Sequence, residues 1–145
     1  MEELIIRESK ESDLIQILSL YLELDERETK IDKAREYYRK ITNDPKSKIY
    51  VAELSDEIVG TFALHLIQSF AHDCVPSAVV EDVAVKRDLQ GKGIGKAMMC
   101  FVLDQSKVLG CYKVALSSQF KRESAHRFYE SLGFEKMGYS FVTAF

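Results

Sequence analysis

The spacing of apolar residues switches between a helical and an extended pattern along the chain. Leu14, Ile17 and Leu18 recur at intervals of three or four residues, as on one face of a helix. The same reading predicts helices over residues 13–24, 30–41, 96–110 and 122–133. Runs rich in β-branched and aromatic residues predict strands over residues 4–9, 48–54, 58–67, 77–85, 112–119 and 134–145. The order β-α-α-β-β-β-α-β-α-β indicates a mixed α/β (α+β) fold class.

Turn-forming residues separate these elements. Residues 55–57 (SDE) lie between two strand-like runs and predict a β-hairpin, while Gly110 and Gly133 each follow a helical run and can end it. The sequence holds only two prolines and seven glycines, so there is little linker material. With 145 residues and 46% hydrophobic content, the chain is predicted to form a single domain over residues 1–145.

The charge balance argues against a nucleic-acid partner. The 20 basic and 23 acidic residues are interspersed and give a net charge of -3. No apolar run approaches the roughly 20 residues that span a bilayer, so we expect no membrane segment. Cys74, Cys100 and Cys111 are not in C-x-x-C spacing, and the N-terminus lacks the apolar stretch of a signal peptide. These features predict a cytoplasmic protein with reduced cysteines.

The stretch QGKGIGKAMM, residues 90–99, places three glycines at alternate positions. A P-loop is excluded because Gln90 stands where its first glycine belongs and Ala97 where its hydroxyl belongs. A dinucleotide fingerprint is excluded because Lys96 occupies the place of its third glycine. Bare backbone N–H groups followed by a helix N-terminus still make a site for a phosphate. The alternative is a loop whose glycines only make a sharp turn.

Two motifs carry a resemblance to a known family. The first, Q/R-x-x-G-x-G/A at the start of a helix, is matched by Gln90, Gly93 and Gly95. The second, A-x-x-[FL]-Y-x-x-x-G-F, is matched by Ala125, Phe128, Tyr129, Gly133 and Phe134. With these motifs and its order of elements, the chain resembles the GNAT superfamily of acetyl-CoA-dependent N-acetyltransferases.

The resemblance implies a GNAT fold, with a mixed, mostly antiparallel central sheet of about six to seven strands flanked by about four helices. It also implies acetyl-CoA as co-substrate. In that family the fourth strand splays from the fifth, so the backbone of Val83, Ala84 and Val85 would pair with the pantetheine arm. The pyrophosphate would rest on Gln90, Gly91, Lys92, Gly93, Ile94, Gly95 and Lys96.

The resemblance places Tyr129 at the family's general-acid position, where it would protonate the departing thiolate. A phenol is protonated at neutral pH because its ordinary pKa is about 10. The alternative is that Tyr129 only packs beside Phe128. The incoming amine must lose a proton, and Glu81 and Asp82 precede the glycine loop on one strand. Adjacent strand residues point to opposite faces, so only one of the two can face the cleft. Glu81, two residues before Val83, is the preferred base, acting through a water, and Asp82 is the fallback.

The expected acceptor is the primary amine of a small molecule. Residues 116–134 (LSSQFKRESAHRFYESLGF) look most like the aminoalkylphosphonate N-acetyltransferase branch of the family. An anionic acceptor needs a cation nearby. Arg122, where the family often has asparagine, could serve, as could Lys121 or Arg7, and His65 lies on a strand whose polar side could face the acceptor. The alternatives are a solvated basic turn and a packed, hydrogen-bonded histidine.

Other readings remain open. A protein lysine or N-terminus could be the acceptor, although no acidic groove is indicated, or the chain could be a non-catalytic acyl-CoA-binding module. Relatives often dimerise, so a homodimer through residues 139–145 is one expectation, and a strand packed within one chain is the other. We expect no metal site, because residues 72–74 (HDC) supply too few ligands. Cys100 reads as a core residue rather than a nucleophile.

Overall fold

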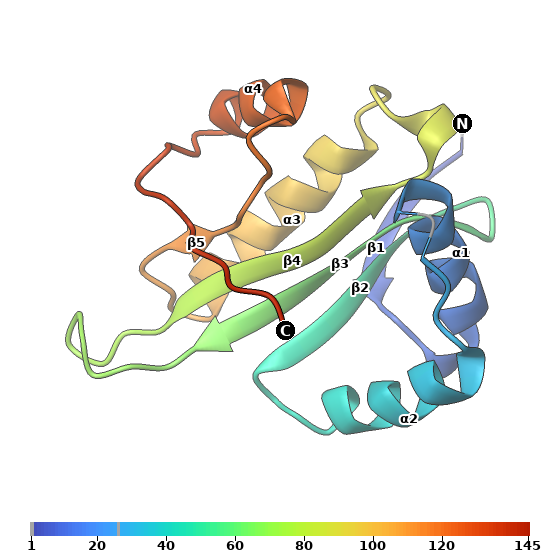
Figure 1. Cartoon of the computed structure of the whole chain (residues 1–145), viewed down its shortest axis with the longest axis horizontal. Helices are drawn as coiled ribbons and strands as arrows, with labels where there is room; N and C mark the ends of the chain where they lie inside the picture. The colour runs from blue at the N-terminus through green and yellow to red at the C-terminus, as the bar shows by residue number, and fades with distance from the viewer. Residues whose placement is uncertain (1, 26) are drawn as a thin grey trace. The chain divides into compact units, whose positions relative to one another are not determined.

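An open five-stranded sheet organises the first 115 residues (Figure 1). The computed structural model describes residues 2–25 and 27–145. The strands lie in the order β1 (Leu4–Glu8), β2 (Ser47–Leu54), β3 (Glu57–Ile67), β4 (Ser77–Val85) and β5 (Val114–Ala115). The first four pair antiparallel and β5 pairs parallel to β4, which confirms the expected mixed, mostly antiparallel sheet.

The chain divides into two compact units, Met1–Ala115 and Leu116–Phe145. The first unit also holds the helices α1 (Leu14–Asp25), α2 (Ile31–Thr42) and α3 (Ile94–Val108) and the 3-10 turns η1 (Glu11–Asp13) and η2 (Arg87–Leu89). The second holds α4 (Glu123–Ser131). The expected four α-helices are confirmed, and a single domain over residues 1–145 stays a prediction. No helix in the described ranges is long and apolar enough to cross a bilayer.

Helix α1 covers one face of the sheet because its apolar stripe faces the strands. Ile17 and Leu20 pack against Val51 of β2 and Ile58 of β3, and all four side chains are almost fully buried. Each of these side chains contributes about 1.5 to 3 kcal/mol through burial. The helix predicted over residues 13–24 is thereby confirmed.

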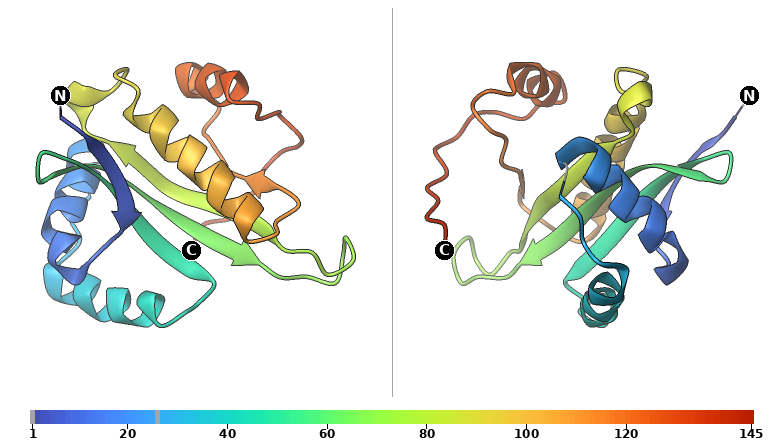
Figure 2. Two further views of the ribbon diagram at one scale, coloured as in Figure 1. Left: turned by 180° about the vertical axis from the view of Figure 1, so that it is seen from behind. Right: turned by 45° about the vertical axis from the view of Figure 1, so that its right-hand side comes forward.

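Helix α3 covers the opposite face of the sheet (Figure 2). The rings of Phe62 in β3 and Phe101 in α3 meet edge-on with their centroids 6.3 Å apart. A Cβ atom at Gly60 would lie 2.7 Å from the sulfur of Met98, so glycine at this position lets the helix approach the strand. Cys100, expected in the core, is exposed, because it lies about 100° around the helix from its buried neighbour Met99.

The expected count of six to seven strands was too high. Of residues 112–119 only Val114–Ala115 forms a strand, and residues 134–145 have no regular secondary structure. The apolar residues of the last segment fit an extended pattern, but a strand also needs a neighbouring backbone for its N–H and C=O groups. Its large apolar side chains are exposed, namely Met137, Tyr139, Phe141, Val142 and Phe145.

Candidate functional site

Strand β4 carries a bulge at its centre. Its pairing passes from Glu81 to Ala84 while β3 advances by only two residues, so Asp82 and Val83 together oppose one residue of β3. The φ angle of Asp82 is 53°, in the left-handed region. This conformation costs an ordinary residue about 1 to 2 kcal/mol. Aspartate tolerates this region better than most residues with a Cβ, so the cost at Asp82 is smaller, and a contact to its backbone can offset it.

The bulge determines the face on which Glu81 lies. Opposed residues of an antiparallel pair share a face, so Glu81 lies with Ala63, and Ala84 lies with Thr61. Glu81 and Ala84 thus share one face although they are three residues apart, which a regular strand does not allow. His65 lies on this face too, two residues beyond Ala63. The structure therefore brings two of the expected site residues, Glu81 and His65, to neighbouring positions.

This face is the one that α1 packs against, since Thr61 is paired with the core residue Val51. Glu81 is exposed on it and His65 is half-buried. The Nδ1 atom of His65 lies 2.9 Å from Oγ of Ser47 on the neighbouring strand, which fixes the orientation of the ring.

The outer edge of β4 is open beyond Val79. Strand β5 pairs with only two residues of β4, and no further strand pairs with that edge in the described part of the chain. The N–H group of Lys86 donates to the carbonyl of Val59 in β3 at 2.8 Å. Peptide groups alternate in direction along a strand, so those of Val85 and Val83 point to the open edge. This edge can pair with an extended ligand.

The glycine loop follows directly from this edge. Gly91 and Gly93 have φ angles of 77° and 89°, where glycine is favoured. No atom lies within 4 Å of the place where either Cβ would stand, so conformation rather than crowding requires these glycines. The side-chain Nε2 of Gln90 donates to the carbonyl of Val85 at 3.1 Å and ties the loop to the strand.

Helix α3 begins without a side-chain cap, because its N-cap residue is Gly93. The N–H of Ala97 donates to the carbonyl of Gly93 at 3.0 Å, so the N–H groups of residues 93–96 precede the first intrahelical bond. Lys92 and Lys96 are exposed beside them and add positive charge. This arrangement attracts a phosphate.

Two contacts join α1 to this region, and no local pattern of residues indicates either of them. The hydroxyl of Tyr21 donates to the carbonyl of Asp82 at 3.0 Å, and the guanidinium of Arg87 donates to the carbonyl of Glu23 at 2.6 Å. Burial, and secondly the carboxylate of Asp82, raise the pKa of Tyr21 well above its ordinary value. Tyr21 therefore stays a donor across the physiological pH range.

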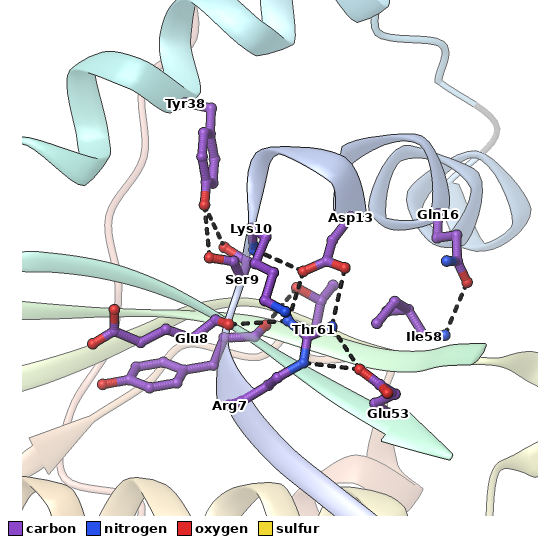
Figure 3. Close-up of polar contacts among 11 residues, drawn as sticks. Arg7, Glu8, Ser9, Lys10, Asp13, Gln16, Tyr38, Glu53, Ile58 and Thr61 are labelled. Carbon is purple, nitrogen blue, oxygen red and sulfur yellow. Dashed lines mark hydrogen bonds and ion pairs between the residues drawn. The ribbon is translucent and has the colours of Figure 1, made fainter. Parts of the chain in front are cut away.

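Arg7 is committed to a network of ion pairs and is not a free cation for an acceptor (Figure 3). It binds Asp13 through two hydrogen bonds of 2.8 and 3.1 Å and Glu53 through bonds of 2.8 and 2.5 Å. Burial alone would raise the pKa of Asp13, but hydrogen bonds from Arg7 and from the N–H of Lys10 lower it below its ordinary value. The group links β1, β2 and the start of α1.

The remaining expected site residues belong to the second unit. The ring of Tyr129 lies between Phe128 and Phe134, at centroid distances of 5.2 and 5.8 Å. Burial raises the pKa of its hydroxyl, and the cation of Arg122 partly opposes this shift. The hydroxyl therefore stays protonated at neutral pH. Packing beside Phe128, the alternative interpretation of Tyr129, agrees with the position of its ring, and the catalytic role of the hydroxyl stays a prediction.

Arg122 is the N-cap residue of α4 and is exposed, as is Lys121. No side chain caps this helix, so its first N–H groups are also unpaired within the helix. The imidazole of His126 binds the carbonyl of Gln119 at 2.8 Å and holds the preceding loop. In the described ranges there is no group of three or more His, Cys, Asp or Glu residues that could hold a metal.

Comparison with known proteins identifies the family. Residues 13–134 match the model of the acetyltransferase (GNAT) family. Glucosamine 6-phosphate N-acetyltransferase of Arabidopsis thaliana is 30% identical over 102 residues, which cover 70% of this chain and 66% of that protein. Aminoalkylphosphonate N-acetyltransferase of Salmonella typhimurium is 24% identical over 139 residues, 96% of this chain and 90% of that protein.

The fold agrees with this match. A crystal structure of glucosamine-6-phosphate N-acetyltransferase from Arabidopsis thaliana has a TM-score of 0.87 at 25% identity, and the match covers 99% of this chain and 99% of that chain. Three relatives are named as glucosamine 6-phosphate N-acetyltransferases, and the matched segments span 35%, 66% and 58% of their lengths. The chain therefore spans less than two thirds of each of these relatives. The chain belongs to the acetyltransferase (GNAT) family.

Proposed function

We propose that this protein is an acetyl-CoA-dependent N-acetyltransferase that acetylates a primary amine of a small molecule. The observation that carries the proposal is the open edge of β4, which leads through the glycine loop into the uncapped N-terminus of α3. An extended arm with amide groups can pair along the edge, and a diphosphate can accept hydrogen bonds at the helix start. Membership of the GNAT family supports acetyl-CoA as the ligand with this shape.

The residues present fit that cofactor. Val83, Ala84 and Val85 would hold the pantetheine arm through the strand edge, and residues 90–96 would hold the pyrophosphate. When bound, acetyl-CoA supplies an acetyl group activated as a thioester. The chain's own contribution is to bind and orient this group and to move two protons.

Glu81 is the proposed base. Its carboxylate would take a proton, through a water, from the ammonium group of the acceptor, and Asp82 is the alternative. The support for Glu81 is its exposure on the face that also carries His65. Tyr129 is the proposed general acid, which would donate its hydroxyl proton to the thiolate sulfur. Its raised pKa supports this role, because the donor must be protonated at working pH.

We propose further that the acceptor carries a phosphate or phosphonate. The relatives named above act, by their names, on glucosamine 6-phosphate and on aminoalkylphosphonates, which share an amine and a phosphorus oxyanion. Arg122 is the proposed partner of the anion because it is an exposed guanidinium at an uncapped helix start. His65, which lies on strand β3 of the sheet, is a further proposed contact of the acceptor.

Release of free thiol from acetyl-CoA tests the function. Glucosamine 6-phosphate and an aminoalkylphosphonate would be compared with glucosamine and an alkylamine, which lack the phosphorus group, and with polyamines and a lysine peptide. We expect turnover with at least one phosphorylated or phosphonate amine and a lower kcat/KM for its matched control. Turnover with the peptide alone would favour a protein acetyltransferase. Tight binding of acetyl-CoA without any turnover would favour a non-catalytic acyl-CoA-binding module.

We also propose that two copies of the chain form a homodimer. It is supported by the exposed apolar side chains of residues 137–145, which a second copy could cover. Light scattering of the purified chain tests it. A molar mass near twice 16.6 kDa is expected, and a mass of 16.6 kDa across the accessible concentrations would exclude the dimer.

A further inference from the structure

The contact between Tyr21 and Asp82 joins two residues that are 61 positions apart in sequence. The ring of Tyr21 packs against the cluster of Ile17, Leu20, Val51 and Ile58, so its position is fixed by the core. Its hydroxyl reaches the carbonyl of Asp82 from α1. A fixed donor is therefore directed at a single peptide group of β4.

That peptide group belongs to the strained residue of the bulge. Within the described chain, the other non-glycine residues with positive φ lie in turns, at residues 55–56 and 72–74, and Asp82 is the one that lies inside a strand. Turns tolerate this conformation more readily than a sheet does, because a sheet must also keep its ladder of hydrogen bonds. The carbonyl of this residue accepts the hydrogen bond from Tyr21.

Loss of the bulge would have a defined geometric consequence. A strand that loses its extra residue shifts its pairing by one position on one side of the bulge, and a shift of one position reverses the faces of the side chains. Either Glu81 would leave the face it shares with His65, or Ala84 would leave its buried place. The hydrogen bond from Tyr21 opposes both changes.

We propose that Tyr21 is a positioning residue for acetyl transfer, which holds the β4 bulge through the carbonyl of Asp82 and thereby keeps Glu81 on the face it shares with His65. This role rests on the proposed function. Tyr21 acts through Asp82 and Glu81, and it is not itself a proposed contact of the cofactor or of the acceptor.

The test uses Tyr21→Phe, which keeps the ring and removes the hydroxyl. We expect kcat to fall about threefold to tenfold, the size of effect that one lost hydrogen bond produces. We also expect the acidic limb of the pH profile of kcat/KM to shift, because a displaced base has a new environment. Tyr37→Phe is the matched control, since Tyr37 is exposed on α2. It should leave kcat, KM and the pH profile unchanged.

The same substitution is then made in an Asp82→Gly background. Glycine adopts positive φ without strain, so the bulge should no longer depend on Tyr21. We expect Tyr21→Phe to change kcat by less than about twofold relative to the Asp82→Gly parent. An equal loss in both backgrounds would overturn the proposal, because Tyr21 would then act by another route. So would an unchanged kcat and pH profile in the Tyr21→Phe single variant.

These outcomes separate the role of Tyr21 from the proposed function. A wild-type protein that consumes no acetyl-CoA with any amine removes the function and this role together. A wild-type protein that is active, with Tyr21→Phe equally active, removes only the role. A Tyr21→Phe protein with the melting temperature of the wild type and a shifted acidic limb supports both.

Discussion

The side-chain nitrogen of Gln90 lies 3.1 Å from the carbonyl oxygen of Val85, so the first residue of the glycine loop is bonded to the last residue of β4. Two surfaces proposed for acetyl-CoA, the strand edge and the loop, are held together by this bond. Gln90→Ala should weaken acetyl-CoA binding about twofold to tenfold, because one neutral hydrogen bond contributes about 0.5 to 1.5 kcal/mol. Titration calorimetry measures the affinity. Gln68→Ala, in an exposed loop, should have no effect.

Gly93→Val should weaken acetyl-CoA binding about tenfold or more. The φ angle of Gly93 is 89°, which is strained for any residue with a Cβ and especially for a β-branched one. The new side chain would also occupy space beside the N–H groups proposed to bind the pyrophosphate. Gly138→Val is the matched control, because Gly138 has an ordinary φ and open space around its Cβ position. Unchanged affinity in the Gly93 variant would exclude the loop as the phosphate site.

Tyr129→Phe should lower kcat by about tenfold to a thousandfold with little change in acetyl-CoA affinity, because a general acid acts in the transition state. Burial raises the pKa of Tyr129, so the protonated, active form persists to higher pH than for an ordinary phenol. Any loss of activity from its ionisation therefore begins above the ordinary phenol pKa of about 10. Rates measured against pH test this, with the exposed Tyr139→Phe as control. Full activity of Tyr129→Phe would exclude the role.

Local sequence patterns predicted the features that depend on neighbouring residues. Ser55 and Asp56 form the hairpin turn with φ angles of 51° and 64°, and Gly110 follows α3 with a φ of 76°. Both outcomes follow from short-range chemistry, because a two-residue hairpin and a helix end need left-handed residues. The positive φ angles of Gly91 and Gly93 in the glycine loop follow from the same short-range chemistry.

Long-range contacts explain what the sequence could not predict. The bulge at Asp82 accepts a hydrogen bond from Tyr21 of α1, which is 61 positions away in sequence, and alternation along β4 alone gives the wrong relation between Glu81 and Ala84. Arg7 looked like a free cation because its partner Glu53 is 46 residues away. Residues 134–145 are a third case, because their alternating apolar residues fit a strand but do not show whether a second strand is present to pair with them.

Asp13→Asn should destabilise the fold by about 2 to 3 kcal/mol at neutral pH, because it removes one charge of a largely buried ion pair while Arg7 keeps Glu53. The pKa of Asp13 is lower in the folded state than in the unfolded state. Its ionised form therefore stabilises the fold fully above the ordinary carboxyl pKa of 3.8, and this contribution is lost as the pH falls through the folded pKa. Urea unfolding at pH 7 and at successively lower pH measures the difference.

The wild-type and Asp13→Asn proteins should approach equal stability as the pH falls below 3.8, the ordinary pKa of the carboxyl group. Glu11→Gln is the matched control. Its partner Arg39 lies at a similar distance of 2.8 Å, but both side chains are exposed, so the pair contributes less than about 1 kcal/mol. A Glu11→Gln effect as large as that of Asp13→Asn would show that net charge, rather than the buried pair, sets the stability. A difference between wild type and Asp13→Asn that did not change with pH would show that packing, rather than ionisation, is responsible.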